Sequence, residues 1–187
     1  MEGIRLTTDR LCIREYRPED IERHHGLIAD PVVMRYIQDV FSHSRAESVA
    51  NLENAIAESL KGDERTMYFF VISDRSTEEY MGGIGYTKLK ESPAGAQAEI
   101  GYFLYPEFWG KGYASEALRA VVRFAFEKGG IYRFNGTCIA ENKASARLME
   151  SCGFVKEAVL KEVQWHEDRL KDRYLYRLLR SEYEDEL

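Results

Sequence analysis

Apolar residues in the first third of the chain mark one strand and two helices. Residues 4–15 alternate loosely between polar and apolar positions, which is typical of an edge strand. Pro18 suits the first turn of a helix that Asp30-Pro31 ends. Ser44 and Glu47 have the spacing of a capping box and open a second predicted helix over residues 44–62. Its apolar face comprises Val49, Leu52, Ile56 and Leu60.

The apolar period then changes from nearly four residues to two. Residues 67–74, 79–90 and 96–106 are separated by turn-rich segments, which predicts an antiparallel meander of three strands. Residues 114–130 return to a helical pattern that stops at Gly129-Gly130. The buried stripe of this helix is expected to comprise Leu118, Val121, Val122, Ala125 and Phe126.

The last third combines a strand, a short helix and two final strands. The strand covers residues 132–140, and Asn142 can cap the helix over residues 142–151. The final strands are predicted at residues 154–165 and 172–180, and the acidic residues 181–187 are expected to be solvated or frayed. An antiparallel half followed by a strand-helix-strand half predicts a single α+β domain with a mixed sheet over residues 1–187.

Length and cysteine content agree with one domain in a reducing compartment. A chain of 187 residues can bury an adequate core without a disulfide or a structural metal. Cys12, Cys138 and Cys152 are widely spaced and form no CxxC pair, so no disulfide framework or zinc site is readable. The charged N-terminus and the lack of a long apolar run disfavour secretion and membrane insertion. We therefore expect a cytoplasmic protein.

The charge balance disfavours nucleic acid as a partner. With 26 basic and 32 acidic residues, the formal net charge is −6, which opposes a general attraction to phosphate backbones. The same charge is compatible with a cationic or amine-bearing substrate. His24, His25 and His166 are expected to be solvated, and no set of metal ligands emerges.

A glycine-rich turn at residues 109–115 carries the clearest chemical signal. Gly110 and Gly112 let backbone N–H groups approach an anion, and the following helix adds the positive end of its dipole. An ordinary turn before a helix is the alternative reading. A P-loop is excluded because Tyr105 stands where its first glycine would be, and Gly112 replaces its Ser or Thr. Residues 82–87 also lack the third glycine of a dinucleotide-binding fingerprint.

This turn resembles the acetyl-CoA signature of the GNAT N-acetyltransferases. The family pattern is Gln or Arg, two residues, Gly, any residue, and Gly or Ala, and here it begins with Trp109 in place of Gln or Arg. The sequence WGKGYASEAL is similar to the ribosomal-protein alanine N-acetyltransferase (RimJ/RimL-like) branch. Residues 140–154 are similar to that branch's N-x-x-S segment. The opening and closing strands resemble it too, so the likeness covers essentially the whole chain.

The resemblance implies a sheet that splays between the strand carrying residues 99–105 and the strand ending near Ala140, with helices on its flanks. It implies acetyl-CoA as the acyl donor, with its pantetheine arm in the opening and its pyrophosphate on the glycine turn. The residues implied to bind the cofactor are Phe103, Leu104, Tyr105, Gly110, Lys111, Gly112, Tyr113, Ala114, Ser115 and Asn142. For Asn142, a purely structural helix cap is the alternative.

Glu99 is the candidate general base, because related enzymes place a catalytic glutamate at this strand position. The alternative is that the Glu99 carboxylate only faces solvent or forms a salt bridge. The usual proton-donating tyrosine is replaced by Met149, so Ser145 is the candidate acid. Ser145 could equally bond within its own helix, and the thiolate could leave unaided.

The expected reaction is direct transfer of acetyl to a primary amine. The resemblance favours a protein N-terminal α-amine as acceptor. A polyamine, an aminoglycoside and a non-catalytic CoA-binding module remain alternatives, because a fold does not fix its ligand. A monomer and a homodimer are both compatible with the sequence.

Overall fold

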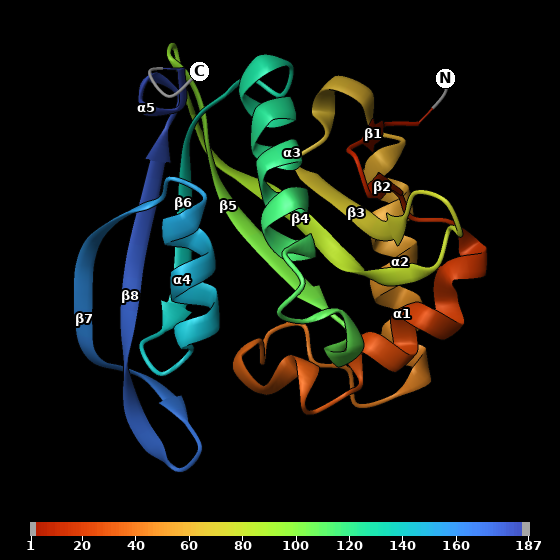
Figure 1. Ribbon diagram of the computed structural model, residues 1–187, viewed down its shortest axis with the longest axis horizontal. Coiled ribbons are helices and arrows are strands. Elements are labelled where there is room, and N and C mark those ends of the chain that lie inside the picture. Colours follow the sequence, from red (N-terminus) through yellow and green to blue (C-terminus); the bar gives the residue numbers. More distant parts are fainter. Residues whose placement is uncertain (1–2, 185–187) are drawn as a thin grey trace. The chain divides into compact units, whose positions relative to one another are not determined.

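The computed structural model describes residues 3–184. Its eight strands form one sheet in the order β1-β2-β3-β4-β5-β6-β8-β7 (Figure 1). The pair β5 and β6 is parallel, and the other registered pairs are antiparallel. The strands are β1 (Arg5–Thr7), β2 (Leu11–Glu15), β3 (Met67–Asp74), β4 (Tyr80–Ser92), β5 (Gly95–Leu104), β6 (Ile131–Ile139), β7 (Val155–His166) and β8 (Arg169–Leu179).

The described part of the chain also contains five α-helices and four short 3₁₀ helices. The α-helices are α1 (Ile21–Ile28), α2 (Arg45–Ser59), α3 (Tyr113–Glu127), α4 (Lys143–Ser151) and α5 (Arg180–Glu184). The 3₁₀ helices are η1 (Pro18–Asp20), η2 (Val33–Tyr36), η3 (Gly62–Glu64) and η4 (Pro106–Phe108). Helices thus flank a mostly antiparallel sheet, and the predicted α+β class is confirmed.

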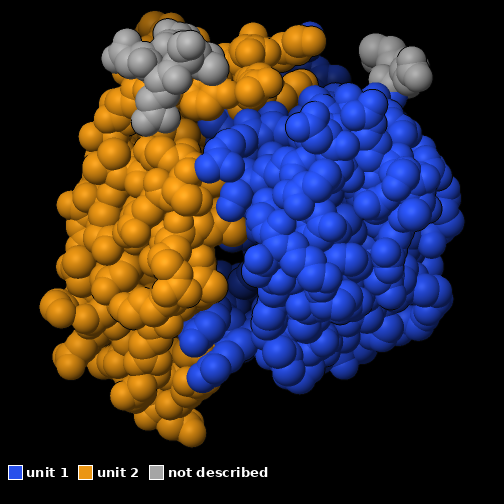
Figure 2. All heavy atoms as spheres, viewed as in Figure 1, with its two compact units in different colours: residues 1–87, 101–122 blue, residues 88–100, 123–187 orange. Residues whose placement is uncertain are grey.

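The chain groups into two compact units, coloured separately in Figure 2. Unit 1 consists of the residues up to 87 together with 101–122, and unit 2 consists of residues 88–100 together with those from 123 onward. Strand β5 therefore begins in unit 2 and ends in unit 1. The extent of a single domain over residues 1–187 stays a prediction.

The N-terminal segment differs from the expected edge strand. It forms a hairpin of β1 and β2, and β2 lies between β1 and β3 in the sheet. Leu11, Cys12 and Ile13 are all buried, so both faces of β2 are covered here, whereas an edge strand with one solvated face would bury only alternate residues. Pro18 does open a helical segment, but its first three residues form η1 before α1 begins.

Unit 1 has its core between the β2–β4 strands and the helices α1 and α2. Leu27, Leu52 and Val71 belong to one buried cluster, against which Phe103 and Tyr105 pack. Ser44 caps α2 by accepting a hydrogen bond from the Glu47 N–H at 3.2 Å, as predicted.

The predicted inward face of α2 is partly wrong. The buried residues of this helix are Ser48, Leu52, Ala55 and Glu58, whereas Leu60 lies past the helix end and is 79% exposed. The helix therefore presents a more polar face to the core than its apolar residues suggest. Glu58 is satisfied there by Lys61 and by the N–H of Met67 at 3.2 Å.

Two of the three expected solvated histidines are buried. His24 is 2% exposed, and its Nε2 lies 2.9 Å from Asn51 Oδ1. Burial lowers the pKa of His24, although the hydrogen bond with Asn51 opposes this shift. His166 is 6% exposed. The neighbouring residues in the sequence are mostly polar, but His24 lies on the buried face of α1 and His166 is the buried last residue of β7.

The central meander and the stripe of α3 agree with the prediction. Strands β3, β4 and β5 follow one another in the sheet, and β3 matches residues 67–74. All five residues expected to line the inner face of α3 are buried, with exposures of 6% or less. Glu116, in the first turn, is only partly exposed, unlike the outward-facing Arg119 and Arg123.

Unit 2 packs α4 and α5 on the strands β6, β8 and β7. Met149 of α4 is buried against β6, where Gly136 leaves room for its sulfur. Residues 181–184 are not frayed, because they continue α5, and Tyr183 packs against Phe126 with ring centroids 5.4 Å apart. The rest of the predicted frayed tail, residues 185–187, lies outside the described residues.

Candidate active site

The glycine turn predicted from sequence opens α3 in unit 1. Gly110 and Gly112 have φ values of +71° and +81°, in the left-handed region that favours glycine. The helix begins at Tyr113, and the Glu116 N–H donates to the Gly112 carbonyl at 3.1 Å. The amides of Tyr113, Ala114 and Ser115 therefore lie in the first turn of α3, at the positive end of the helix dipole, which suits an anion.

Trp109 holds the start of this turn. Its indole Nε1 donates to the Leu104 carbonyl at 2.8 Å, while the residue remains 49% exposed. The family pattern has Gln or Arg at this position, which are also side chains with N–H donors. Trp109 therefore also has an N–H donor at this position, and it binds the Leu104 carbonyl at the end of β5.

The backbone at the end of β5 is already partly used by the fold. The Tyr105 N–H donates to the Met81 carbonyl of β4 at 3.0 Å, and the Tyr105 carbonyl accepts from the Phe108 N–H at 3.0 Å. The Phe103 carbonyl also lies against β4, beside Gly82. Because backbone groups alternate in direction along a strand, the Leu104 N–H faces away from β4. Of the three predicted pantetheine-binding residues, Leu104 has the N–H that best suits this role.

Glu99 lies in unit 2, where β5 pairs with β6. The parallel ladder runs from Ala96 to Glu99 on β5, and Glu99 pairs with Asn135. Its side chain is exposed, whereas those of Ala98 and Ile100 are buried, so it lies on the opposite face of the strand from them. Within residues 3–184 it forms no ion pair of the kind that the salt-bridge alternative would require.

A hydrogen-bonded chain leads from Glu99 to β8. The Thr137 hydroxyl donates to Glu99 Oε1 at 3.3 Å, and Arg173 Nη2 donates to the same Thr137 oxygen. A guanidinium can only donate, so the Thr137 proton is left to point toward the carboxylate. Thr137 and Arg173 were not predicted from sequence, because neither belongs to a motif.

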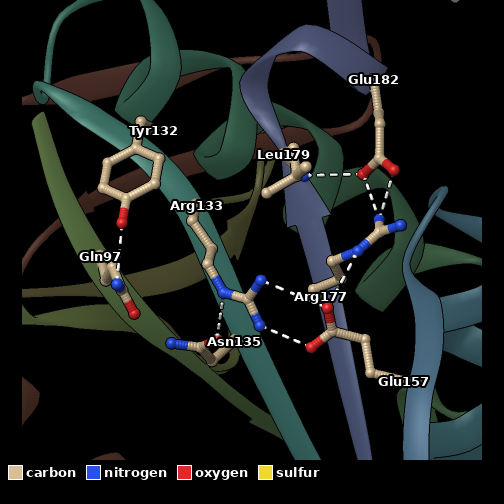
Figure 3. Close-up of polar contacts among 8 residues, drawn as sticks. All are labelled: Gln97, Tyr132, Arg133, Asn135, Glu157, Arg177, Leu179 and Glu182. Atoms are coloured by element: carbon tan, nitrogen blue, oxygen red, sulfur yellow. Dashed lines mark hydrogen bonds and ion pairs between the residues drawn. The ribbon is translucent and has the colours of Figure 1, made fainter. Parts of the chain in front are cut away.

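Arginines and carboxylates neutralise one another on the same face of unit 2 (Figure 3). Arg133 Nη2 contacts Glu157 Oε2 at 2.6 Å, and Arg177 Nε contacts Glu157 Oε1 at 3.1 Å. Arg177 also pairs with Glu182. The hydrogen bond from Arg133 is the main cause that lowers the pKa of Glu157. This part of unit 2 is thus polar but carries balanced charges.

Asn142 and Ser145 meet at the start of α4. The Ser145 N–H donates to Asn142 Oδ1 at 3.1 Å, so the capping role of Asn142 is present in the structure. Burial raises the pKa of Cys138. Met149, in place of the usual tyrosine, is a core residue with 1% exposure.

Neither a metal cluster nor a membrane span is found among residues 3–184. No group of three or more His, Cys, Asp or Glu side chains there could hold a metal ion. No helix in that part of the chain is long and apolar enough to cross a membrane. The three cysteines are free thiols.

Comparisons with known proteins agree with this geometry. The Acetyltransferase (GNAT) domain family matches residues 10–155. An uncharacterised N-acetyltransferase, p20 of Bacillus licheniformis, is 32% identical over 180 residues, which cover 95% of this chain and 97% of that protein.

Two solved structures share the fold. The spermidine N-acetyltransferase of Vibrio cholerae, in complex with CoA and spermine, has a TM-score of 0.81 and 22% identity, over 94% of this chain and 99% of that one. RimL, a ribosomal L7/L12 α-N-protein acetyltransferase in complex with coenzyme A, has a TM-score of 0.81 and 19% identity, over 94% of this chain and 98% of that one. Both identities are low, so these likenesses bear on the fold. With the family match and the relative in Bacillus, they establish that the chain belongs to the GNAT acetyltransferases.

Proposed function

We propose that this protein is an acetyl-CoA-dependent N-acetyltransferase that moves an acetyl group directly to a primary amine. The observation that carries the proposal is the turn of Gly110 and Gly112 at the start of α3, whose backbone suits a pyrophosphate. Gly112 has a φ of +81°, which residues with a Cβ rarely adopt, so this shape of the turn depends on glycine. The two solved structures with bound CoA support the same donor.

In this proposal, the amides of residues 110–115 bind the pyrophosphate, and the exposed Lys111 side chain adds positive charge. The pantetheine arm lies along the end of β5, as an added strand would, and the Leu104 N–H polarises the thioester carbonyl. The neighbouring residues Phe103 and Tyr105 hold Leu104 in register with β4. Asn142 fixes the start of α4 through its bond with the Ser145 N–H.

Glu99 prepares the acceptor for attack. At pH 7 about one in ten α-amines is neutral, against fewer than one in a thousand lysine amines, because their ordinary pKa values are near 8 and 10.4. Glu99 accepts the proton, directly or through a water molecule, as nitrogen attacks the thioester carbon. The bound thioester supplies the acetyl group, and its carbon–sulfur bond breaks as the amide forms. Ser145 is the candidate donor of the proton that the departing thiolate takes up, and its hydroxyl regains a proton from solvent as Glu99 releases the one it accepted.

A protein N-terminal α-amine is the proposed acceptor. A polyamine carries several positive charges and needs a site with excess negative charge. On this face of unit 2, however, Glu157 and Glu182 are already paired with Arg133 and Arg177, and Arg173 adds a positive charge that is linked to Glu99 through Thr137. A single α-amine followed by peptide carbonyls suits such a mixture, because arginine N–H groups can donate to carbonyl oxygens.

The proposal is tested with acetyl-CoA and a panel of acceptors, by CoA release and intact-mass detection. The panel should hold peptides with different N-terminal residues, the same peptides with blocked N-termini, spermidine and an aminoglycoside. A mass increase of one acetyl group on free N-termini alone supports the proposal. Acetylation of spermidine or the aminoglycoside in preference to peptides would overturn the acceptor, and acetyl-CoA that neither binds nor reacts would overturn the function.

A further inference from the structure

Arg10, in the turn between β1 and β2, reaches the glycine turn from far away in the sequence. Its Nη1 donates to the Lys111 carbonyl at 3.0 Å, and its Nε donates to Glu116 Oε2 at 2.7 Å. The guanidinium also lies over the Tyr113 ring, 4.5 Å from the centroid. One side chain thus contacts the glycine turn and the first turn of α3 together, all within unit 1.

The bond to the Lys111 carbonyl has a consequence for the next amide. A trans peptide is planar, and its C=O and N–H point in opposite directions. Among the described residues there is no cis peptide bond. When Arg10 holds the Lys111 carbonyl on one side, the Gly112 N–H must therefore point to the other side. The left-handed φ of +81° at Gly112 then continues the chain into α3.

Arg10 also neutralises a carboxylate that would otherwise repel an anion. Glu116 stands in the first turn of α3, and its Oε2 lies 2.6 Å from Arg10 Nη2. The Thr8 hydroxyl donates to Glu116 Oε1 at 2.5 Å, and the Arg10 N–H donates to the same oxygen at 3.1 Å. Although burial raises the pKa of Glu116, these bonds outweigh it and lower the pKa overall. Glu116 is thus held charged and turned toward the β1–β2 turn.

We propose that Arg10 is a positioning residue for the acyl donor, which directs the Gly112 N–H toward the pyrophosphate by holding the Lys111 carbonyl, with Glu116 as its anchor. This inference rests on the proposed function. Arg10 contacts no reacting atom in this scheme. Its effect is on donor affinity, and only on donors that carry a pyrophosphate.

The test compares Arg10→Met with the control Arg5→Met. Both arginines are about half exposed and ion-paired, with side-chain exposures of 46% and 49%, so neither change should greatly affect stability. For Arg10→Met we expect the KM for acetyl-CoA and the Kd for CoA to rise about tenfold, with kcat unchanged. This is the effect of losing one charge-assisted hydrogen bond, the one from the Gly112 N–H to the pyrophosphate. Arg5→Met should behave like the wild type.

S-acetylpantetheine, which lacks the pyrophosphate, separates positioning from general damage. Its kcat/KM should be the same for the wild type and Arg10→Met. An equal loss with both donors, or an unchanged KM for acetyl-CoA, would overturn the inference. If the wild-type protein itself binds no CoA, the proposed function fails instead, so the two failures are distinguishable.

A double variant separates the two effects of Arg10. Arg10→Met combined with Glu116→Gln removes both charges, so no unpaired carboxylate is left in the first turn of α3. The Lys111 carbonyl still lacks its hydrogen bond from the Arg10 guanidinium. CoA affinity that stays about tenfold weaker supports positioning of the Gly112 N–H. Recovery of wild-type affinity would show that charge neutralisation alone matters, and would overturn the proposal.

Discussion

Replacing Gly112 by Glu should remove the thermal protection that acetyl-CoA gives this protein. At 100 times its Kd a ligand stabilises the folded state by about 2.7 kcal/mol. For a chain of 187 residues this corresponds to a rise in Tm of roughly 5–10 °C. The wild type should show a shift of this size when its melting is followed with and without acetyl-CoA.

The new carboxylate acts against the pyrophosphate. Two unit charges of the same sign about 4 Å apart repel by about 4 kcal/mol near a protein surface, which weakens binding about a thousandfold. At the same acetyl-CoA concentration, the shift in Tm for Gly112→Glu should then fall below about 1 °C. The left-handed φ of +81° adds about 1–2 kcal/mol of strain that lowers the Tm of the variant even without ligand.

Gly62→Glu is the matched control, because it adds the same charge and a similar strain elsewhere. Gly62 has a φ of +58°, and a Cβ there would meet nothing within 4 Å. Its Tm should fall without ligand, but acetyl-CoA should still protect it. Undiminished protection in Gly112→Glu would refute the assignment of the pyrophosphate to this turn.

Three further predictions concern catalysis and acid stability. Glu99→Gln should slow acetyl transfer roughly 100-fold, most strongly at low pH, with nearly unchanged CoA affinity; a pH–rate profile like that of the wild type would exclude Glu99 as the base. Thr137→Val should lower kcat up to about tenfold without affecting the KM for acetyl-CoA, whereas Thr137→Ser keeps the hydroxyl and should restore kcat; equal rates for both variants would contradict the orienting role. Hydrogen bonds from Ser76 and Thr77 lower the pKa of Asp74 to about 2 from 3.8, so its stabilising contribution is present above that ordinary value and is lost as the pH falls toward about 2. Acid denaturation followed by circular dichroism should therefore depend less on pH for Asp74→Asn than for the wild type, and identical curves would contradict this.

Local signals in the sequence predicted the parts of the site that local chemistry determines. Glycines before a helix predict a turn with left-handed φ, and Gly110 and Gly112 adopt it. Asn142 predicts a cap, because its side chain needs only an N–H three residues later. The spacing of Ser44 and Glu47 likewise predicted the cap at the start of α2.

The contacts that orient these residues come from distant positions and could not be predicted in this way. Arg10 is 101 residues from Lys111, and Thr137 is 38 residues from Glu99. Periodicity also placed Leu60 on the inner face of α2, although the helix ends before it. His24 is buried and hydrogen-bonded to Asn51 in another helix. Each of these features is set by tertiary packing, on which one segment of sequence carries no information.

The indole of Trp109 gives the glycine turn a spectroscopic label of its own. The chain has only two tryptophans, and the other, Trp165, is 66% exposed near the end of β7. In a Trp165→Phe background, emission would come from Trp109 alone, half exposed and bonded to the Leu104 carbonyl. Donor binding at the turn could then be followed by fluorescence in real time, without a dye or a coupled reaction.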